Sequence, residues 1–463
     1  MNKTLRAATS LTPLVTIVIL AYWLIVLVVN APGQLSYDSV VQLWEGRTGD
    51  YRSMHPPIMS ALLGLFDRAL SGTVLYVVFA SGLFIVALLI VVKRGIASDA
   101  RSRLLCVVFG LLLLNPMMVV YQGTVWKDVL FANIVALSFS LLTFSSKIQP
   151  SMKGMIFLVA AAVLSGFAVL VRQQGLIVAV GVAATASFVM PKSTTSFQRM
   201  LISVTCILIA LSTAVSTTYL IRKTSSGGLP DTTEMGLRIL RSYDILGMIV
   251  HGTPIPEDSH LSLEGRQAVE SYAAKIYTAA RVDPVTSEIA PDAWIDLSST
   301  EVQKIWSSMI IAHPANYVAH RVNVFRWQIF PRDIYQCLPI HVGVSGPAKL
   351  IAELGLTEGQ RASDQSLYRY ARALFHTPLF SGLAWALASF SIALYILLRR
   401  FPEPGHVAVF GLQITSLAYL GSYFFVGIAC DFRYVFLVPV SVCVGLACLI
   451  SSSRAGSRSL VEK

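Results

Sequence analysis

Long apolar runs separated by short polar connections dominate the chain. Ten of these runs are candidates for crossing a bilayer, which takes about 20 mostly apolar residues. Their approximate cores are residues 12–30, 73–92, 104–120, 128–145, 154–171, 174–190, 200–221, 376–398, 405–428 and 433–451. The pattern predicts an all-α polytopic membrane protein with about ten transmembrane helices.

Two longer polar segments interrupt this pattern, at residues 31–71 and 222–375. We therefore expect three parts. The first, 1–221, holds seven helices and the polar loop 31–71, the second, 222–375, forms a mainly helical domain outside the membrane, and the third, 376–463, holds three helices and a tail. Within the second part, Ser298-Ser299-Thr300-Glu301 predicts the start of a helix, and Pro314 predicts a division into two helices.

Composition and charge agree with this interpretation. Of the 463 residues, 55% are hydrophobic and 13% are charged, about half the charged share of a soluble domain. The net charge of +11 does not indicate nucleic-acid binding, because the basic residues lie in alternate short connections instead of on one face. Cytoplasmic loops are enriched in Lys and Arg, so we expect both termini in the cytoplasm and a location in the inner (plasma) membrane.

Cysteine usage adds little at this stage. Cys430 lies at a helix end and Cys337 stands alone in the large polar segment, whereas the other cysteines lie inside apolar runs. We therefore expect no disulfide framework in the polar segment. No Cys and His residues have the spacing of metal ligands.

The loop 31–71 holds the first candidates for chemistry. Ser36 is a suitable N-cap, which would place Asp38 in the first helical turn, where the helix dipole favours an ionised carboxylate. His55 precedes Pro56-Pro57, so it is expected at the start of a second helix. The plainer alternatives are that Asp38 only stabilises its helix and that His55 is an ordinary loop histidine.

Three short outer connections add further polar side chains. Singly, each is explained by anchoring at the membrane interface. Together, the three connections place cations on the outer side, where Lys and Arg are otherwise scarce. Arginines are good partners for phosphate. The predicted substrate-binding residues are Lys127, Asp128, Arg172, Gln173, Asp431, Arg433 and Tyr434.

A first helix followed by an outer loop with an Asp and then His-Pro-Pro resembles the GT-C superfamily of membrane glycosyltransferases. Within it, the chain is most similar to the bacterial mannosyltransferase-like and aminoarabinose-transferase-like branch. The pairs Lys127-Asp128 and Arg433-Tyr434 also look like those of bacterial relatives. The resemblance covers most of the membrane part but not residues 222–375.

The resemblance implies transfer of a sugar from a polyprenyl-phosphate donor to an envelope glycan, lipid or protein acceptor. It implies catalytic roles for Asp38 and His55, with the cations on the departing phosphate. Many family members carry paired acids in this loop, but Tyr37 and Ser39 flank Asp38. A divalent cation therefore stays an open alternative, with Glu45 and Asp50 as substitutes for the second acid. A lipid-sugar flippase, a polysaccharide polymerase or ligase, and a scaffold subunit are the competing hypotheses.

Overall fold

The computed structural model describes residues 10–145, 152–191, 193–284, 290–401 and 404–451. Its regular structure is helical, and within these ranges β-pairing is confined to isolated bridges. Seven helical segments there are long and apolar enough to cross a membrane. They are α1 (Thr12–Asn30), α4 (Val74–Val92), α7 (Lys127–Ser145), α8 (Met152–Val171), α10 (Ser196–Thr224), α20 (Pro404–Val426), and η3 (Phe432–Val435) with α21 (Leu437–Ser451). The all-α membrane fold is thus confirmed.

The remaining three predicted spans are shorter. Two of them are single apolar helices, α9 (Gly175–Val189) and α19 (Gly382–Leu398). The third was predicted as one continuous helix over 104–120, and that prediction is wrong. It consists of α5 (Ala100–Leu113) and α6 (Pro116–Tyr121), because Pro116 cannot donate a helical hydrogen bond and the Asn115 side chain accepts from the Met117 N–H at 2.9 Å.

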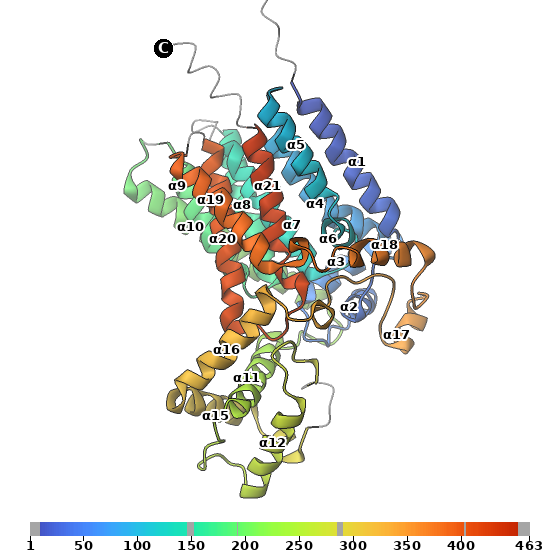
Figure 1. The fold of residues 1–463 in the computed structure, drawn as a ribbon, viewed down its shortest axis with the longest axis vertical. Helices are drawn as coiled ribbons and strands as arrows, with labels where there is room; N and C mark the ends of the chain where they lie inside the picture. Colours follow the sequence, from blue (N-terminus) through green and yellow to red (C-terminus); the bar gives the residue numbers. More distant parts are fainter. Residues whose placement is uncertain (1–9, 146–151, 192, 285–289, 402–403, 452–463) are drawn as a thin grey trace, which may run out of the picture.

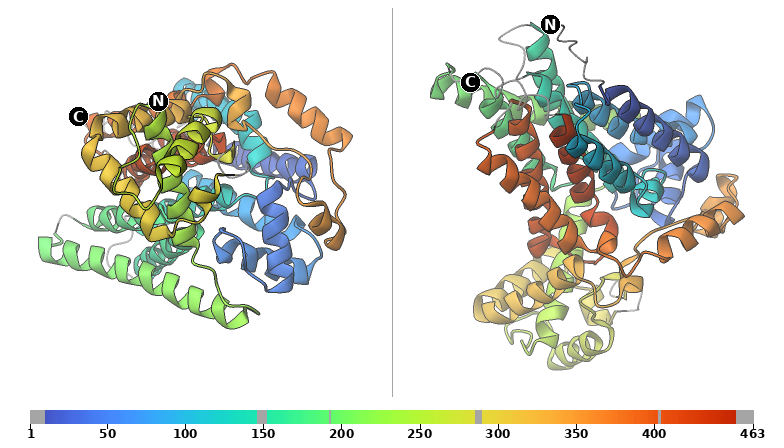
Figure 2. Two further views of the ribbon diagram at one scale, coloured as in Figure 1. Left: turned by 90° about the horizontal axis from the view of Figure 1, so that it is seen from below. Right: turned by 45° about the horizontal axis from the view of Figure 1, so that its top comes forward.

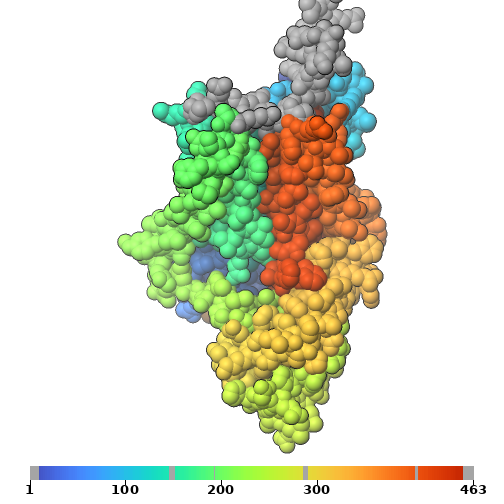
Figure 3. Space-filling view, turned by 90° about the vertical axis from the view of Figure 1, so that its left-hand side faces the viewer, coloured from blue at the N-terminus to red at the C-terminus, as the bar shows by residue number. Residues whose placement is uncertain are grey.

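The apolar helices form one bundle (Figure 1). α1 begins and α21 ends at the same end of it. At the opposite end, here called the domain end, lies a helical domain with an apolar core of its own (Figure 3). Ser298 caps α15 and Pro314 opens α16, as predicted. The helical domain consists of α11 (Thr232–Val250), α12 (Leu263–Ile276), α14 (Asp292–Ile295), α15 (Ser299–Ala312) and α16 (Pro314–Ile329).

Residues 334–375 form a separate arm that runs sideways from the helical domain (Figure 2). The arm contains η1 (Ile334–Cys337), α17 (Ala348–Glu353) and α18 (Ala362–Arg372), and the short turn η2 (Pro378–Phe380) leads from it into α19. Its buried side chains, among them Ile340 and Leu367, belong to the apolar core of the membrane bundle. The Tyr370 hydroxyl also donates to the Leu114 carbonyl at 2.5 Å. The arm therefore lies along the domain end of the bundle.

The loop between α1 and α4 folds into two packed helices, α2 (Tyr37–Thr48) and α3 (Pro57–Ala69). Ser36 is the N-cap residue of α2, and its N–H donates to the Ser39 hydroxyl at 3.2 Å. α2 and α3 cross where Gly46 meets Ser60. A Cβ atom on Gly46 would lie 2.1 Å from the Ser60 carbonyl oxygen, so a glycine is needed there. Both predicted helix starts in this loop are confirmed.

Inside the bundle, a buried amide holds the C-terminal helices together. Gln413 on α20 is fully buried, and its Nε2 donates to the Ser441 carbonyl of α21 at 2.8 Å. Its Oε1 accepts from the Ser389 hydroxyl of α19 at 2.8 Å. Hydrogen bonds between helices in an apolar environment add to the packing that associates them. They fix α20, which carries part of the candidate site, against α21, which follows directly on η3.

A disulfide joins Cys337 of the arm to Cys430, which follows α20, with a Cα–Cα distance of 4.8 Å. The expectation that the polar segment holds no disulfide framework therefore missed this bond. The two residues lie 93 positions apart in the sequence, and only the fold brings them together. The predicted topology places both cysteines on the same side of the membrane, outside the apolar runs, and that was the available signal.

Candidate active site

A short extended segment before α2 sets the position of the candidate site. The Gln34 N–H donates to the Gly123 carbonyl at 3.0 Å, and the Leu35 N–H donates to the Gly343 carbonyl at 2.9 Å. The buried Gln34 amide also accepts from the Gly343 N–H at 2.6 Å and donates to Asp364 of α18 at 3.0 Å. The loop is thus held between the α6–α7 connection and the arm, and α2 starts from a fixed point.

Asp38 lies in the first turn of α2 and faces two other segments at the domain end of the bundle. Its Oδ2 accepts a hydrogen bond from Nη1 of Arg433 at 2.8 Å, and its Oδ1 lies 3.5 Å from Nε2 of His55. Burial opposes ionisation, but the positive charge of Arg433 and the other neighbouring cations outweighs it and holds the pKa of Asp38 well below its usual range. Asp38 is therefore ionised at neutral pH.

His55 stands just before α3, with a side chain that is only 13% exposed. Burial, and then the nearby charge of Lys127, lowers its pKa from 6.5 to about 4. His55 is consequently neutral at pH 7, so its contact with Asp38 is not an ion pair. A neutral imidazole can either donate or accept a hydrogen bond, which suits a group that orients a hydroxyl.

This low pKa links His55 to stability in acid. The folded state takes up its proton at about pH 4 and the unfolded state at about 6.5, so protons favour unfolding between these values. Protonation of His55 should lower the free energy of unfolding of the native protein by about 3 kcal/mol between pH 6.5 and 4. We expect the His55→Gln protein not to show this loss. Thermal unfolding in detergent across this range measures the difference. His260→Gln, at an exposed position, is the control, and equal acid sensitivity of His55→Gln and native protein would contradict the assignment.

Arg172 lies at the end of α8 within a cage of tyrosines. The guanidinium carbon is 5.1 Å from the ring centre of Tyr434, 5.7 Å from that of Tyr423 and 6.0 Å from that of Tyr419. It also forms an ion pair with Asp128 at the start of α7. Cation–π contacts and an ion pair hold this buried arginine in one place.

Arg433 occupies the centre of the site. Besides Asp38, its Nε lies 3.1 Å from Oδ2 of Asp431, and its guanidinium carbon lies 5.4 Å from the rings of both Trp126 and Tyr434. The Trp126 indole is itself fixed, because its N–H donates to the Ser36 hydroxyl at 2.9 Å. Burial raises the pKa of Asp431, and the charge of Arg433 opposes this rise. The arginine thus bridges carboxylates from two distant segments of the chain.

Lys127 is the third cation, at the first position of α7. Its charge acts on both Asp38 and His55. Within the described ranges of the chain, it makes no ion pair. A cation inside such a cluster, without a carboxylate of its own, suits an anionic ligand.

The structure brings together eight of the nine predicted site residues and leaves one aside. Gln173 is exposed, and its amide nitrogen faces Gly236 of α11. The convergent residues are Asp38, His55, Lys127, Asp128, Arg172, Asp431, Arg433 and Tyr434.

The sequence interpretation missed the residues that support this cluster. Tyr419 and Tyr423 sit one helical turn apart in an apolar run, where tyrosine usually indicates the membrane interface. Their spacing of four residues, on the same helix face, was the available signal. Gln34 gave no signal at all.

The two acids that the sequence offered as substitutes for a second catalytic acid do not join Asp38. The Glu45 carboxylate accepts hydrogen bonds from the N–H groups of Arg52 and Ser53, at 2.9 and 2.7 Å, and from the Ser60 hydroxyl at 2.7 Å. Asp50 pairs with the exposed Arg52 at 2.6 Å. Glu45 therefore shapes the turn that leads to His55. Among the described residues, no group of three or more His, Cys, Asp or Glu side chains could hold a metal ion.

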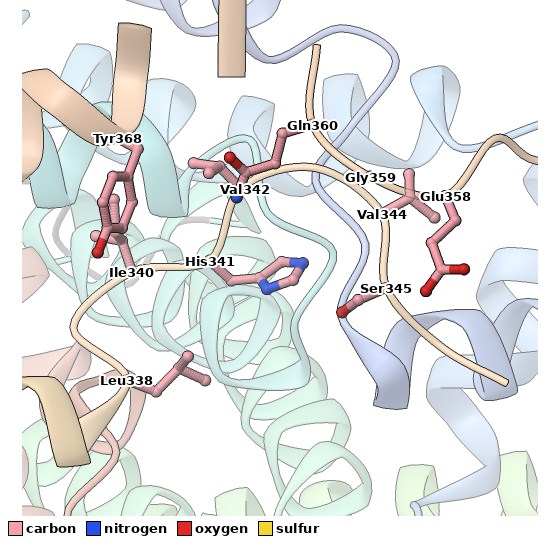
Figure 4. A pocket seen from close by; sticks show the side chains of 10 residues that line it. All are labelled: Leu338, Ile340, His341, Val342, Val344, Ser345, Glu358, Gly359, Gln360 and Tyr368. Carbon is pink, nitrogen blue, oxygen red and sulfur yellow. The ribbon is translucent and has the colours of Figure 1, made fainter. Parts of the chain in front are cut away.

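A cavity of about 380 Å³ lies in the arm next to this cluster (Figure 4). Apolar side chains line it together with His341, Tyr368, Ser345 and Glu358. The His341 ring lies 6.2 Å from that of Trp126, and its Nε2 donates to the Leu35 carbonyl at 2.9 Å. Burial lowers the pKa of His341, so this imidazole is neutral. His341 thus stands between the cavity and the segment that leads to Asp38.

Comparisons with known proteins give one structural neighbour. A scan against models of protein families finds no match, and a search of curated proteins finds no similar sequence. Among solved structures, the chain is similar to the archaeal oligosaccharyltransferase AglB from Archaeoglobus fulgidus, solved in complex with an inhibitory peptide and a dolichol-phosphate. The identity is 12% and the TM-score is 0.41. The match covers 97% of this chain and 51% of AglB, so the chain spans about half the length of that protein.

Proposed function

We propose that this protein is a membrane glycosyltransferase. It moves a sugar from a polyprenyl-phosphate donor to an envelope glycan, lipid or protein acceptor. The observation that carries the proposal is that Lys127, Arg172 and Arg433, from three connections, gather at one end of the bundle beside the ionised carboxylate of a fourth. The resemblance of the first loop to the GT-C superfamily agrees with it.

In this proposal the domain end faces outward from the inner (plasma) membrane, and both termini are cytoplasmic. The basic residues of the connections at the other end support this orientation. The disulfide between Cys337 and Cys430 supports it as well, because disulfides persist in oxidising compartments outside the cytoplasm.

The donor phosphate is placed among Lys127, Arg172 and Arg433. The tyrosine cage and Asp128 hold Arg172, so it meets the phosphate without reorganisation. Arg433 is shared, because a phosphate in this position competes with Asp38 for its guanidinium. Donor binding then releases Asp38 from its ion pair. The pKa of Asp38 rises as a result, and the carboxylate becomes a stronger base when it is needed.

The transfer step uses the freed carboxylate. Asp38 accepts the proton of the acceptor hydroxyl or amine as that atom bonds to the anomeric carbon. The bond from the anomeric carbon to the phosphate oxygen breaks, and its electron pair stays on the phosphate, where the cations stabilise it. His55, neutral and 3.5 Å from Asp38, orients the acceptor or a sugar hydroxyl. We assign the cavity beside His341 to the acceptor, since it adjoins the site and is lined by the arm.

A vesicle assay tests the proposal. The purified protein is reconstituted with radiolabelled polyprenyl-phosphate sugars and an envelope extract as the source of acceptor. We expect label to appear in a new product together with free polyprenyl phosphate, in equal amounts. Movement of the donor across the bilayer without product would favour a flippase. Consumption of a polyprenyl-pyrophosphate donor alone would favour a polymerase or ligase, and either result would overturn the proposal.

A further inference from the structure

The connection between α20 and η3, residues 427–431, leads directly to Arg433 and is held from outside the membrane bundle. The Cys430 N–H donates to the Ala280 carbonyl at 2.7 Å, and Ala429 forms an antiparallel bridge with Arg281. Gln328 of α16 donates to the Asp431 carbonyl at 3.4 Å. With the Cys430 disulfide, these contacts attach the connection to the helical domain and the arm.

One further attachment uses a fully buried charge. Arg321 of α16 has no exposed surface, and its Nη1 donates to the Gly427 carbonyl at 2.8 Å, just after α20. Its Nη2 lies 2.5 Å from Oδ1 of Asp244 on α11. The two ends of one guanidinium thus tie the helical domain to the start of the connection.

A polar network surrounds the Asp244 carboxylate. Its Oδ1 accepts from Nε2 of His320 at 2.9 Å, and its Oδ2 accepts from the Trp306 indole at 2.9 Å. The Tyr277 hydroxyl donates to Nδ1 of His320 at 2.8 Å. Burial lowers the pKa of His320, so this histidine is neutral and the ion pair of Asp244 is the one with Arg321.

Such a pair is a poor choice for stability alone. Apolar residues of similar volume often replace a buried ion pair without loss of stability, so the pair points to a need for fixed geometry. The geometry that it fixes is the end of α20. Arg433 follows Gly427 by six residues and makes the contacts to Asp38 and Asp431.

We propose that Arg321 is a positioning residue for Arg433. By tying α16 to the Gly427 carbonyl, it fixes the connection so that Arg433 reaches Asp38 and the donor phosphate. The inference rests on the phosphate-binding role of Arg433 proposed above. It gives the helical domain a part in the reaction apart from any contact with the acceptor.

Arg321→Lys is the informative substitution. Lysine keeps a charge for Asp244, so the helical domain stays folded, but its single ammonium group cannot replace a fork that spans two acceptors. Arg326→Lys, at an exposed position of the same helix, is the matched control. Hydrogen exchange followed by mass spectrometry reports on the peptide 427–433 in the full-length protein. We expect exchange there to be at least about tenfold faster in Arg321→Lys, and unchanged in Arg326→Lys.

Sugar transfer supplies a second readout. We expect Arg321→Lys to lower kcat about tenfold with little change in KM, and to move the acid limb of the pH profile of kcat/KM, which reports the free enzyme, to higher pH. That shift follows because Asp38 loses the charge that lowers its pKa, which a general loss of folded enzyme would not cause.

The two readouts separate the two proposals. Unchanged exchange of the peptide 427–433, or faster exchange with an unmoved pH profile in an active enzyme, overturns the positioning role. If the native protein transfers no sugar but exchange of this peptide is faster in Arg321→Lys, the proposed function is overturned, while the attachment of the connection by Arg321 is supported.

Discussion

Replacement of Asp38 by asparagine is expected to slow sugar transfer by about 100- to 10,000-fold, the range of a lost general base. Asparagine keeps the shape of the side chain and its place in the first turn of α2. It removes the proton acceptor and leaves Arg433 with Asp431 as its remaining carboxylate partner. The loss should therefore fall on kcat, with the KM for donor changed less. Initial rates of transfer in vesicles measure it.

Asp50→Asn is the control, because Asp50 lies in the same loop and pairs only with the exposed Arg52 among the described residues. Exposed ion pairs contribute about 0–1 kcal/mol, so this variant should transfer sugar at nearly the native rate. Native rates in both variants, at equal amounts of inserted protein, would remove Asp38 from the chemistry.

Arg433→Ala is expected to reduce kcat by about 1,000-fold, as removal of a charge-stabilising donor does in other enzymes. The guanidinium bridges Asp38 and Asp431 at 2.8 and 3.1 Å, and it stands between Trp126 and Tyr434. Its loss removes the phosphate ligand and also raises the pKa of Asp38 in the free enzyme, so the acid limb of the pH profile of kcat/KM should move to higher pH.

Arg433→Lys should restore part of the rate, to within about 10- to 100-fold of native, since it keeps the charge but not the fork. Arg332→Ala, an exposed arginine of the same side, serves as the control for the loss of a positive charge. A profile that keeps its acid limb in Arg433→Ala, or equal losses in the alanine and lysine variants, would contradict this role.

The sequence was sufficient for the local features of the fold. Apolar runs predicted the long helices, and Ser36, Pro57 and Pro314 marked helix starts that the structure confirms. These features depend on a few neighbouring residues, through capping, the missing N–H of proline and lipid-facing periodicity. Asn115-Pro116 is also a local signal, for a helix break, but it lies inside a long apolar run that predicts one continuous helix.

The candidate site was predicted as a set of residues and not as a geometry. The charge rule placed Asp38 and Arg433 on one side of the membrane, but no rule pairs residues 395 positions apart. The disulfide of Cys337 and the Gln34 contacts could not be predicted either, because they also join residues that are far apart in the sequence and depend on how the arm crosses the first loop. Gln173 is the one predicted site residue outside the cluster, because adjacency to Arg172 in sequence does not bring both side chains to one face of a helix end.

The proposed function depends on Lys127, Arg172 and Arg433 holding the phosphate of a lipid-linked donor. An experimental structure of the protein in lipid nanodiscs with polyprenyl phosphate tests it most directly. We expect phosphate density within about 4 Å of the Arg172 and Arg433 guanidinium groups, with Arg433 turned from Asp38 toward the phosphate. Density for the phosphate at any other place on the bundle, with Arg433 still paired to Asp38, would contradict it.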